Sequence, residues 1–249
     1  MEEYQSIVSI IALTLGASWA SGINLYATIA MLGISSATGS FELPPDLQIL
    51  AEPIVIIAAS AMYVVEFFAD KIPGVDSAWD SLHTFIRIPA GTMLAAGSMG
   101  EMGPELQLAA AILGGTLATS SHAAKAGTRV IINTSPEPFT NWTASVVEDV
   151  AVVGGMWAAM YNPWLFFGML AVFIMLLVII LPKIWQAIKG IFRFIGKLFG
   201  AEEPAQSASQ SQTGNHLDQL KKLKDLFDSG ALTEEEFQQQ KTKLLKNQR

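Results

Sequence analysis

Residues 66–80 read E-F-F-A-D-K-I-P-G-V-D-S-A-W-D and join two long apolar segments. This stretch carries four acidic residues against the single cation Lys71. Glu66 and Asp70 are four residues apart, so they lie on one face of a helix. If that helix ends near Lys71, Glu66 lies roughly 6 Å inside the apolar zone, at about 1.5 Å per residue. An ionisable group at that depth needs a partner, a wet cavity or a proton, so the stretch predicts a membrane protein with a polar interior.

The composition of the whole chain agrees with this interpretation. Of 249 residues, 51% are hydrophobic and 15% are charged, whereas soluble domains carry about 25% charged residues. Eleven of the fifteen Lys and Arg residues lie at Lys183 or later, which argues against a nucleic-acid partner for the first part of the chain. The chain has no cysteine, so disulfides and thiolate metal sites are excluded. The start, Met-Glu-Glu, lacks the cationic region of a secretory signal, so we expect the first apolar segment to be retained.

Six apolar segments are long enough to cross a bilayer, which needs about 20 residues. We therefore predict an all-α, polytopic membrane protein of about six transmembrane helices within residues 1–182. When the amino terminus is placed inside, the Lys and Arg residues of the connections also fall inside, which predicts that both termini are cytoplasmic. The six segments are 6–34, 47–70, 82–99, 105–121 (continuing to 134), 141–161 and 163–181.

Six spans divide into two halves of opposite orientation, which permits an inverted repeat. The first helix of each half is long and is interrupted by small polar residues. The interruptions lie around Ser21 and Asn24 in the first helix and around Ser121 and His122 in the fourth. Such paired interruptions indicate a binding site where broken helices meet. The alternative is that small residues allow close packing while hydroxyls bond back to their own helix.

A first buried polar cluster is predicted between the second and third spans. A short connection makes these spans antiparallel neighbours, and Glu66 and Arg87 lie about equally far from it. We therefore predict a contact between Glu66 and Arg87, with His83 one turn before Arg87 on the same face. The alternative is a salt bridge that only neutralises both charges. In the same region Asp76 and Asp80 are expected to cap a helix, because their spacing matches no calcium loop.

A second cluster is predicted in the other half. Lys125 and Arg129 share one helix face, and Glu148 lies on the order of 10 Å inside the fifth span. If residues 122–134 fold back against that span, His122 joins these three side chains in a buried cluster. The alternative is that Lys125 and Arg129 anchor the protein at the lipid headgroups.

No motif of a hydrolase, metalloprotease, P-loop or dinucleotide-binding enzyme is present in the sequence. We therefore expect no enzymatic activity, no catalytic residue, no metal and no cofactor. Buried carboxylates with basic neighbours fit the handling of a proton or cation better than hydrolysis.

The chain changes character after Pro182. Residues 183–200 have apolar positions at helical spacing and no acidic residue, which predicts a cationic amphipathic helix on the membrane surface. Anionic lipid headgroups would contact its cations Lys183, Lys189, Arg193 and Lys197.

The carboxy-terminal part is predicted to be a linker and a helical hairpin. Residues 201–215 are polar and read as a flexible linker. Within 216–249, Thr233 and Glu236 have the spacing of a capping box that starts the second short helix. About thirty residues cannot bury a core of their own. We therefore expect this hairpin to dock on a second copy, making a homo-oligomer, or on a partner.

Two parts of the chain resemble known families. S-W-A-S-G-I-N-L-Y-A at 18–27, the stretch 66–80, and S-P-x-P at 135–138 with nearby Asn141 resemble the signatures of an uncharacterised bacterial integral-membrane family. This is domain-of-unknown-function family 4126, and the resemblance covers roughly residues 5–182. The tail, with its G-x-L-T-x-E-E-F pattern, resembles the SHOCT (short C-terminal domain) module. The resemblances imply a bacterial inner-membrane protein whose tail supports oligomerisation, and they imply no activity.

The leading functional prediction is a small transporter or channel-like permease for a small ion or solute, in which buried carboxylates bind a proton or cation. The alternatives are a non-transporting scaffold that acts through the hairpin and an intramembrane enzyme that acts on lipid. The residues predicted to line the pathway are Ser21, Asn24, Glu66, Asp70, His83, Arg87, Ser121, His122, Lys125, Arg129 and Glu148.

Overall fold

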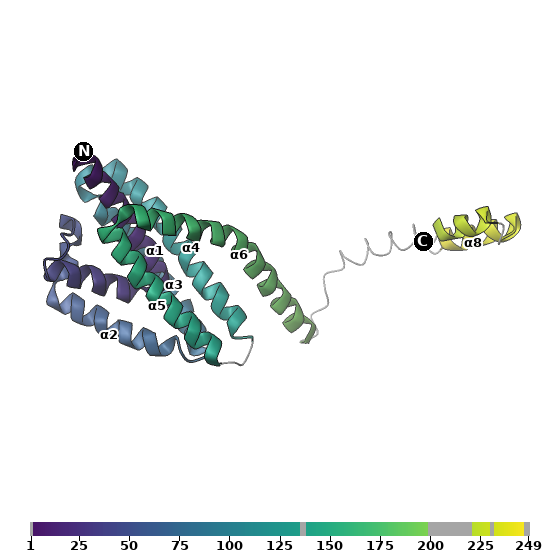
Figure 1. Ribbon diagram of the computed structural model, residues 1–249. Helices are drawn as coiled ribbons and strands as arrows, with labels where there is room; N and C mark the ends of the chain where they lie inside the picture. Colours follow the sequence, from purple (N-terminus) through teal and green to yellow (C-terminus); the bar gives the residue numbers. More distant parts are fainter. Residues whose placement is uncertain (1, 135–137, 199–220, 230–231, 247–249) are drawn as a thin grey trace. The chain divides into compact units, whose positions relative to one another are not determined.

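The computed structural model describes residues 2–134, 138–198, 221–229 and 232–246 (Figure 1). These residues form helices and connections and contain no strand, which confirms the all-α prediction. The chain divides into two compact units, Met1–Ile191 and Phe192–Arg249. The elements in order are α1 (Glu2–Ala37), the short 3-10 helix η1 (Pro45–Ala51), α2 (Pro53–Ala69), α3 (Val75–Ser98), the 3-10 turn η2 (Gly100–Met102), α4 (Pro104–Ile132), α5 (Pro138–Tyr161), α6 (Pro163–Leu198), a helix over 221–228, and α8 (Glu234–Lys246).

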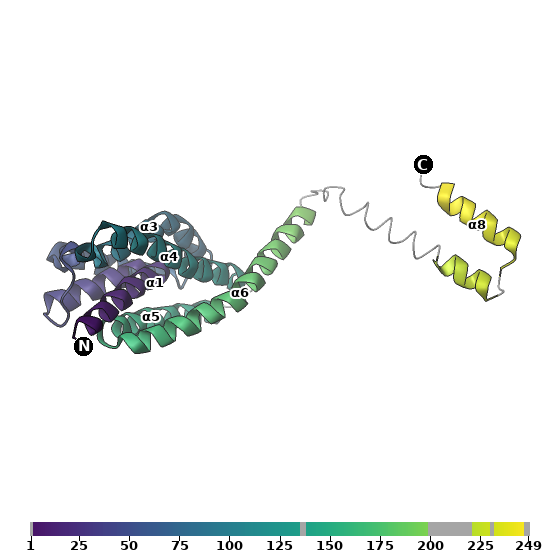
Figure 2. The same ribbon diagram turned by 90° about the horizontal axis from the view of Figure 1, so that it is seen from above.

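Helix α1 is the centre of the first unit. It packs against α2, α3, α4 and α5, and Figure 2 shows α3 and α4 on one side of it with α5 and α6 on the other. The apolar core lies on the α5 and α6 side, where the Trp19 ring makes edge contacts with Phe166 and Phe173. Buried polar side chains lie on the α3 and α4 side. The division gives α1 one apolar and one polar face.

The interruption predicted in the first helix is confirmed, and it is a break at Asn24. This residue has φ −144° and ψ 96°, an extended conformation inside an otherwise helical run. Its side-chain Oδ1 accepts a hydrogen bond of 2.9 Å from the backbone N–H of Ala27. An extended residue whose side chain binds an N–H three positions later is a helix N-cap. Asn24 therefore ends the first half of α1 and starts the second.

Helix α1 also folds back at this break. A side chain at Gly16 would meet Ala159 near the end of α5, while the carbonyl of Ser40, just beyond α1, accepts a hydrogen bond of 3.3 Å from Tyr161. In a straight helix Gly16 and the end of α1 at Ala37 would be about 30 Å apart, yet Gly16 and Ser40, three residues beyond Ala37, both lie beside the last turn of α5. The two halves of α1 thus form a helical hairpin whose tip is Asn24 (Figure 1).

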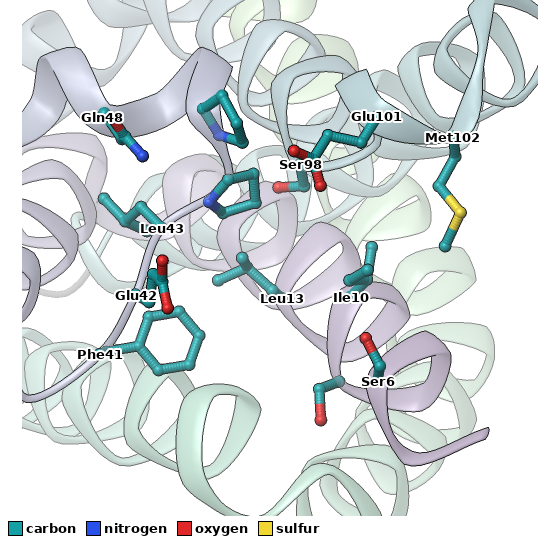
Figure 3. A pocket seen from close by; sticks show the side chains of 13 residues that line it. Ser6, Ile10, Leu13, Phe41, Glu42, Leu43, Gln48, Ser98, Glu101 and Met102 are labelled. Atoms are coloured by element: carbon teal, nitrogen blue, oxygen red, sulfur yellow. The ribbon is translucent and has the colours of Figure 1, made fainter. Parts of the chain in front are cut away.

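A pocket lies at the end of the bundle where the open ends of this hairpin come together, opposite its tip. Its volume is about 450 Å³, and Figure 3 shows Ser6 and Leu13 of α1 facing Glu42 of the following connection, with Ser98 and Glu101 beside them. Helix α3 ends at this pocket and has 24 residues, a length of about 36 Å. The connection between α2 and α3 therefore lies at the opposite end of the bundle from residues 6–13.

The number of spans differs from the prediction. Within the described residues three helices are long and apolar enough to cross a membrane: Glu3–Ala37, Phe139–Tyr161 and Pro163–Gln186. The pair η1 and α2, bent by 67°, would make a fourth. Helices α3 and α4 fall short because small and polar residues such as Gly, Ser and Thr lower their mean hydropathy. Since α1 also turns back, it does not cross the bundle from end to end. The count of membrane crossings that predicted both termini on the same side therefore no longer applies.

Helix boundaries were also predicted wrongly at three places. Helix α3 begins at Val75 rather than 82, because the Asp76 carboxylate accepts the N–H groups of Gly74 and Ser77 and so starts the helix. Helix α4 is continuous, so the predicted interruption of the fourth helix is wrong and only one of the paired breaks of the inverted repeat is present in the described chain. Its hydroxyls bond back instead, as Thr119 does to the Gly115 carbonyl at 2.6 Å. Helix α6 runs through Pro182 to Leu198, so the amphipathic segment predicted over 183–200 continues the last span instead of starting a new helix, and its contact with the membrane surface stays a prediction.

The second unit contains the predicted capping box. The Glu236 carboxylate accepts hydrogen bonds from the Thr233 N–H at 3.0 Å and hydroxyl at 2.8 Å. These two bonds hold the pKa of Glu236 below its ordinary value. The rings of Phe227 and Phe237 stack with centroids 4.8 Å apart. The linker predicted over 201–215 lies outside the described residues.

Candidate functional site: a buried charge network

The predicted contact between α2 and α3 is confirmed. Arg87 Nη2 lies 2.6 Å from Glu66 Oε1, and both side chains are fully buried. The same guanidinium donates through Nη1 to Asp80 Oδ1 at 2.8 Å. His83 does not join them, since its ring bonds the Tyr26 hydroxyl at 3.0 Å and stacks on a neighbouring indole. Asp80 is therefore an ion-pair partner of Arg87, and its predicted role as a helix cap is wrong.

Lys125 joins the two clusters that the sequence suggested separately. Its Nζ lies 2.7 Å from Asp70 Oδ2 and 3.4 Å from Glu66 Oε1 on α2. It is also 3.6 Å from Asp80 on α3 and 3.7 Å from Glu148 on α5. Only 2% of the Lys125 side chain is exposed. The alternative of an anchor at the headgroups is therefore wrong for this lysine.

Arg129, one turn further along α4, is also buried. Its Nη2 lies 2.6 Å from Glu148 Oε2, while Nη1 donates to the backbone carbonyl of Asp70 at 3.0 Å. Nη1 also contacts Asn141 on α5, whose amide donates to Asn133 at 2.8 Å. The predicted group of Lys125, Arg129 and Glu148 thus exists as a contact between α4 and α5. We call Glu66, Asp70, Asp80, Arg87, Lys125, Arg129 and Glu148 the charge network.

The break in α1 lies directly against this network. Helix ends leave backbone carbonyls without partners, and side chains of α4 donate to two carbonyls near the end of the first half of α1. Lys125 Nζ donates to the carbonyl of Ile23 at 3.1 Å, and Ser121 Oγ donates to that of Trp19 at 2.9 Å. A cation at the carbonyl end of a helix is stabilised by the helix dipole. Asn24 in turn donates through Nδ2 to Asp149 at 3.2 Å.

His122 extends the network on the α3 side. Arg87 lies 3.3 Å from its Nδ1, and the Thr84 hydroxyl lies 2.7 Å from its Nε2. A guanidinium can only donate, so Nδ1 must accept and Nε2 carries the hydrogen. His122 is therefore a neutral imidazole in this arrangement. Ser21 is buried next to it on α1 and donates to the Ser18 carbonyl at 2.8 Å.

The polar contacts continue toward the connection between α2 and α3. Asp76 accepts hydrogen bonds from Asn133 at 2.8 and 3.0 Å as well as from its own helix start. Lys71 donates to Ser145 on α5 at 3.3 Å, and its ammonium lies over the Phe67 ring. Burial lowers the pKa of Lys71, because the charged form loses water. The charge network and these neighbouring polar contacts together reach from the tip of α1 to one end of the bundle.

The structure brings ten of the eleven predicted pathway residues to the network or the break beside it, and His83 lies one contact away through Tyr26. Sequence reasoning missed Asp80, Asp149 and Asn141 as members of the site. The signal for Asp80 was its distance of seven residues from Arg87, two helical turns on one face. Among the residues that the structure describes, no group of three or more His, Asp and Glu is arranged to hold a metal ion.

Comparisons with known proteins place the two parts of the chain. No curated protein and no solved structure is significantly similar to it. Residues 218–245 match the Short C-terminal domain, as their sequence suggested. Residues 11–183 match a second family model, and they include every residue of the charge network. Because that match covers more than half of the chain, this protein belongs to the family described as Domain of unknown function (DUF4126).

Proposed function

We propose that this protein is a small permease of the bacterial inner membrane, and that its charge network handles a proton or small cation during transport. The observation that carries the proposal is the buried network at the break of α1. Seven charged side chains from four helices meet there, and six of them, all except Glu148, are less than 5% exposed. Transport, rather than catalysis, is the use of buried charge that fits this arrangement.

A purely structural role does not explain so many charges. Burying an ion pair costs desolvation energy that its own attraction often fails to recover, so apolar side chains of similar size would stabilise the fold as well. Charged residues within membrane segments are rare for this reason and mark ion pathways or proton relays.

The broken helix supports the same conclusion. Transporters often bind their substrates and ions where discontinuous helices expose backbone groups near the middle of the membrane. Here the carbonyl end of the first α1 half meets Lys125, and the second half starts at Asn24 beside Asp149. Buried hydroxyls of Thr14, Ser18 and Ser21 follow the first half of α1 from the pocket of Figure 3 toward the network. We propose this seam as the pathway.

Flux through the reconstituted full-length protein tests the proposal. Liposomes with an imposed pH gradient and a trapped pH-sensitive dye are expected to lose the gradient faster when they contain the protein. Glu66→Gln should return the rate to that of protein-free liposomes, whereas Glu105→Gln, an exposed carboxylate at the start of α4, should leave it unchanged. Equal rates with and without the native protein, for protons and for added small cations, would overturn the proposal.

A scaffold function is the second candidate, because the carboxy-terminal unit matches a module separate from the membrane family. Deleting residues 201–249 separates the two. A permease keeps its flux without this unit, whereas a scaffold loses its assembly with partners while the membrane unit stays folded.

A further inference from the structure

We infer that Glu66, Asp70 and Asp80 hold one proton between them at neutral pH, so that the centre of the charge network is an occupied proton site. The inference deepens the proposed function, since it identifies the ion, but it depends only on burial and contacts. It holds whether or not the proton is moved across the membrane.

The first argument is the charge of the inner group, which we define as Glu66, Asp70, Asp80, Arg87 and Lys125. Three carboxylates face two cations, so one negative charge is left over when all are ionised. The exposed fraction is 0% for Glu66, 3% for Asp70 and 1% for Asp80. An uncompensated charge buried to this degree is so costly that the group takes up a proton instead.

The surroundings do not supply the missing positive charge. Arg129 lies 2.6 Å from Glu148 and 3.9 Å from Asp70, and Lys71 donates to Ser145 and to the Phe67 carbonyl. The outer carboxylates Glu148 and Asp149 add negative charge and supply no cation. The charged and titratable groups facing the inner group are Tyr26 on α1, Tyr63 on α2, Lys71 just after α2, His83 on α3, His122 and Arg129 on α4, and Glu148 and Asp149 on α5.

The second argument is that each of the three carboxylates has one buried oxygen that accepts no hydrogen bond from the described residues. Glu66 Oε2, Asp70 Oδ1 and Asp80 Oδ2 are buried and accept no hydrogen bond from any residue that the structure describes. A buried acceptor without a donor carries its full desolvation cost, and most severely when it is charged. Protonation of one carboxylate removes the excess charge, and its other oxygen can still accept a hydrogen bond from the neighbouring cation.

A proton fits this site better than a metal cation, because the ammonium of Lys125 already takes the central position. Five oxygen atoms surround Nζ at 2.7 to 3.7 Å. A second cation among the same oxygens would lie close to both Lys125 and Arg87 and would be repelled. The five oxygens belong to Ile23, Glu66, Asp70, Asp80 and Glu148.

Infrared spectroscopy of the full-length protein in lipid at neutral pH tests this inference. The native protein should show the C=O band of a buried carboxylic acid, identified by its shift in D2O. Each of Glu66→Gln, Asp70→Asn and Asp80→Asn should remove the intensity of one carboxyl group, because each removes the excess charge. Glu105→Gln serves as the matched control and should leave the band unchanged.

Three variants are used so that the failure of one to fold leaves the others informative. A native protein without the band, or a band that persists in all folded variants, would overturn the inference. If the infrared band is present but no proton or cation flux is found, the proposed transport is refuted and the proton site stands. If flux is found without the band, the proton site is refuted and the proposed transport stands.

Discussion

Replacing Arg87 by Gln should destabilise the protein more than any other single change in the charge network. The guanidinium is fully buried and contacts both Glu66 and Asp80, at 2.6 and 2.8 Å. Without it these two carboxylates keep only Lys125, at 3.4 and 3.6 Å. Removing one partner of a buried ion pair costs about 3–5 kcal/mol, because the other charge is left uncompensated. The unfolding equilibrium should therefore shift by about a hundredfold or more, at about 1.4 kcal/mol per factor of ten.

The double variant Arg87→Gln with Glu66→Gln gives this prediction its control. It removes one negative charge together with the positive one, so it should recover much of the lost stability. The stability lost in the Arg87→Gln single variant should also be smaller at lower pH, where the two carboxylates left without Arg87 can take up protons. Unfolding in detergent, followed by tryptophan fluorescence, measures both variants, with exposed Lys183→Gln as the comparison. A loss below about 1 kcal/mol, the size of an average substitution, or a double variant less stable than the single one, would refute the reasoning.

Two further predictions concern packing and capping. Gly22→Ala should lower the stability by about 1–3 kcal/mol, because its Cβ would overlap Ser121 and a backbone carbonyl of α4. The control is Gly154→Ala, whose Cβ meets no described atom within 4 Å and which should be neutral or stabilising. Equal melting temperatures of the two variants would contradict this prediction. In the tail, the pKa of Glu236 is lowered by its bonds to Thr233, so the cap stabilises α8 at neutral pH and is lost as the pH falls through the ordinary carboxylate range. Amide hydrogen exchange in the first turn of α8 should accelerate there, and Glu236→Gln, which cannot titrate, should abolish that pH dependence. An unchanged pH profile would argue against the capping box.

The sequence was sufficient to predict the contact between Glu66 and Arg87. Two antiparallel helices joined by a short connection bring together residues equally far from it, and a buried carboxylate needs a cation. Both conditions depend on spacing along the chain alone. The capping box at Thr233 was predictable for the same reason, because its bonds join residues three apart.

The burial of Lys125 and Arg129 could not be predicted in this way. Long cationic side chains near the end of a membrane helix usually reach the headgroups. Their burial here depends on carboxylates of α2 and α5, which the chain supplies 55 residues before and 23 residues after Lys125. The fold-back of α1 was hidden for a related reason. Asn24 is a single polar residue in an apolar run, and only its contacts with α4 and α5 show that it ends one helix and starts another.

The hydrogen bonds at the tip of α1 also set an order for biosynthesis. The carbonyls of Trp19 and Ile23 receive their donors from Ser121 and Lys125, each 102 residues later in the chain. Unsatisfied backbone groups are costly in lipid, so α1 cannot reach its final conformation when it first leaves the ribosome. The hairpin of α1 must close after α4 has been inserted, which makes the centre of the bundle the last part of the membrane unit to mature. Truncated nascent chains that stop before α4 should accordingly hold α1 as an ordinary straight helix.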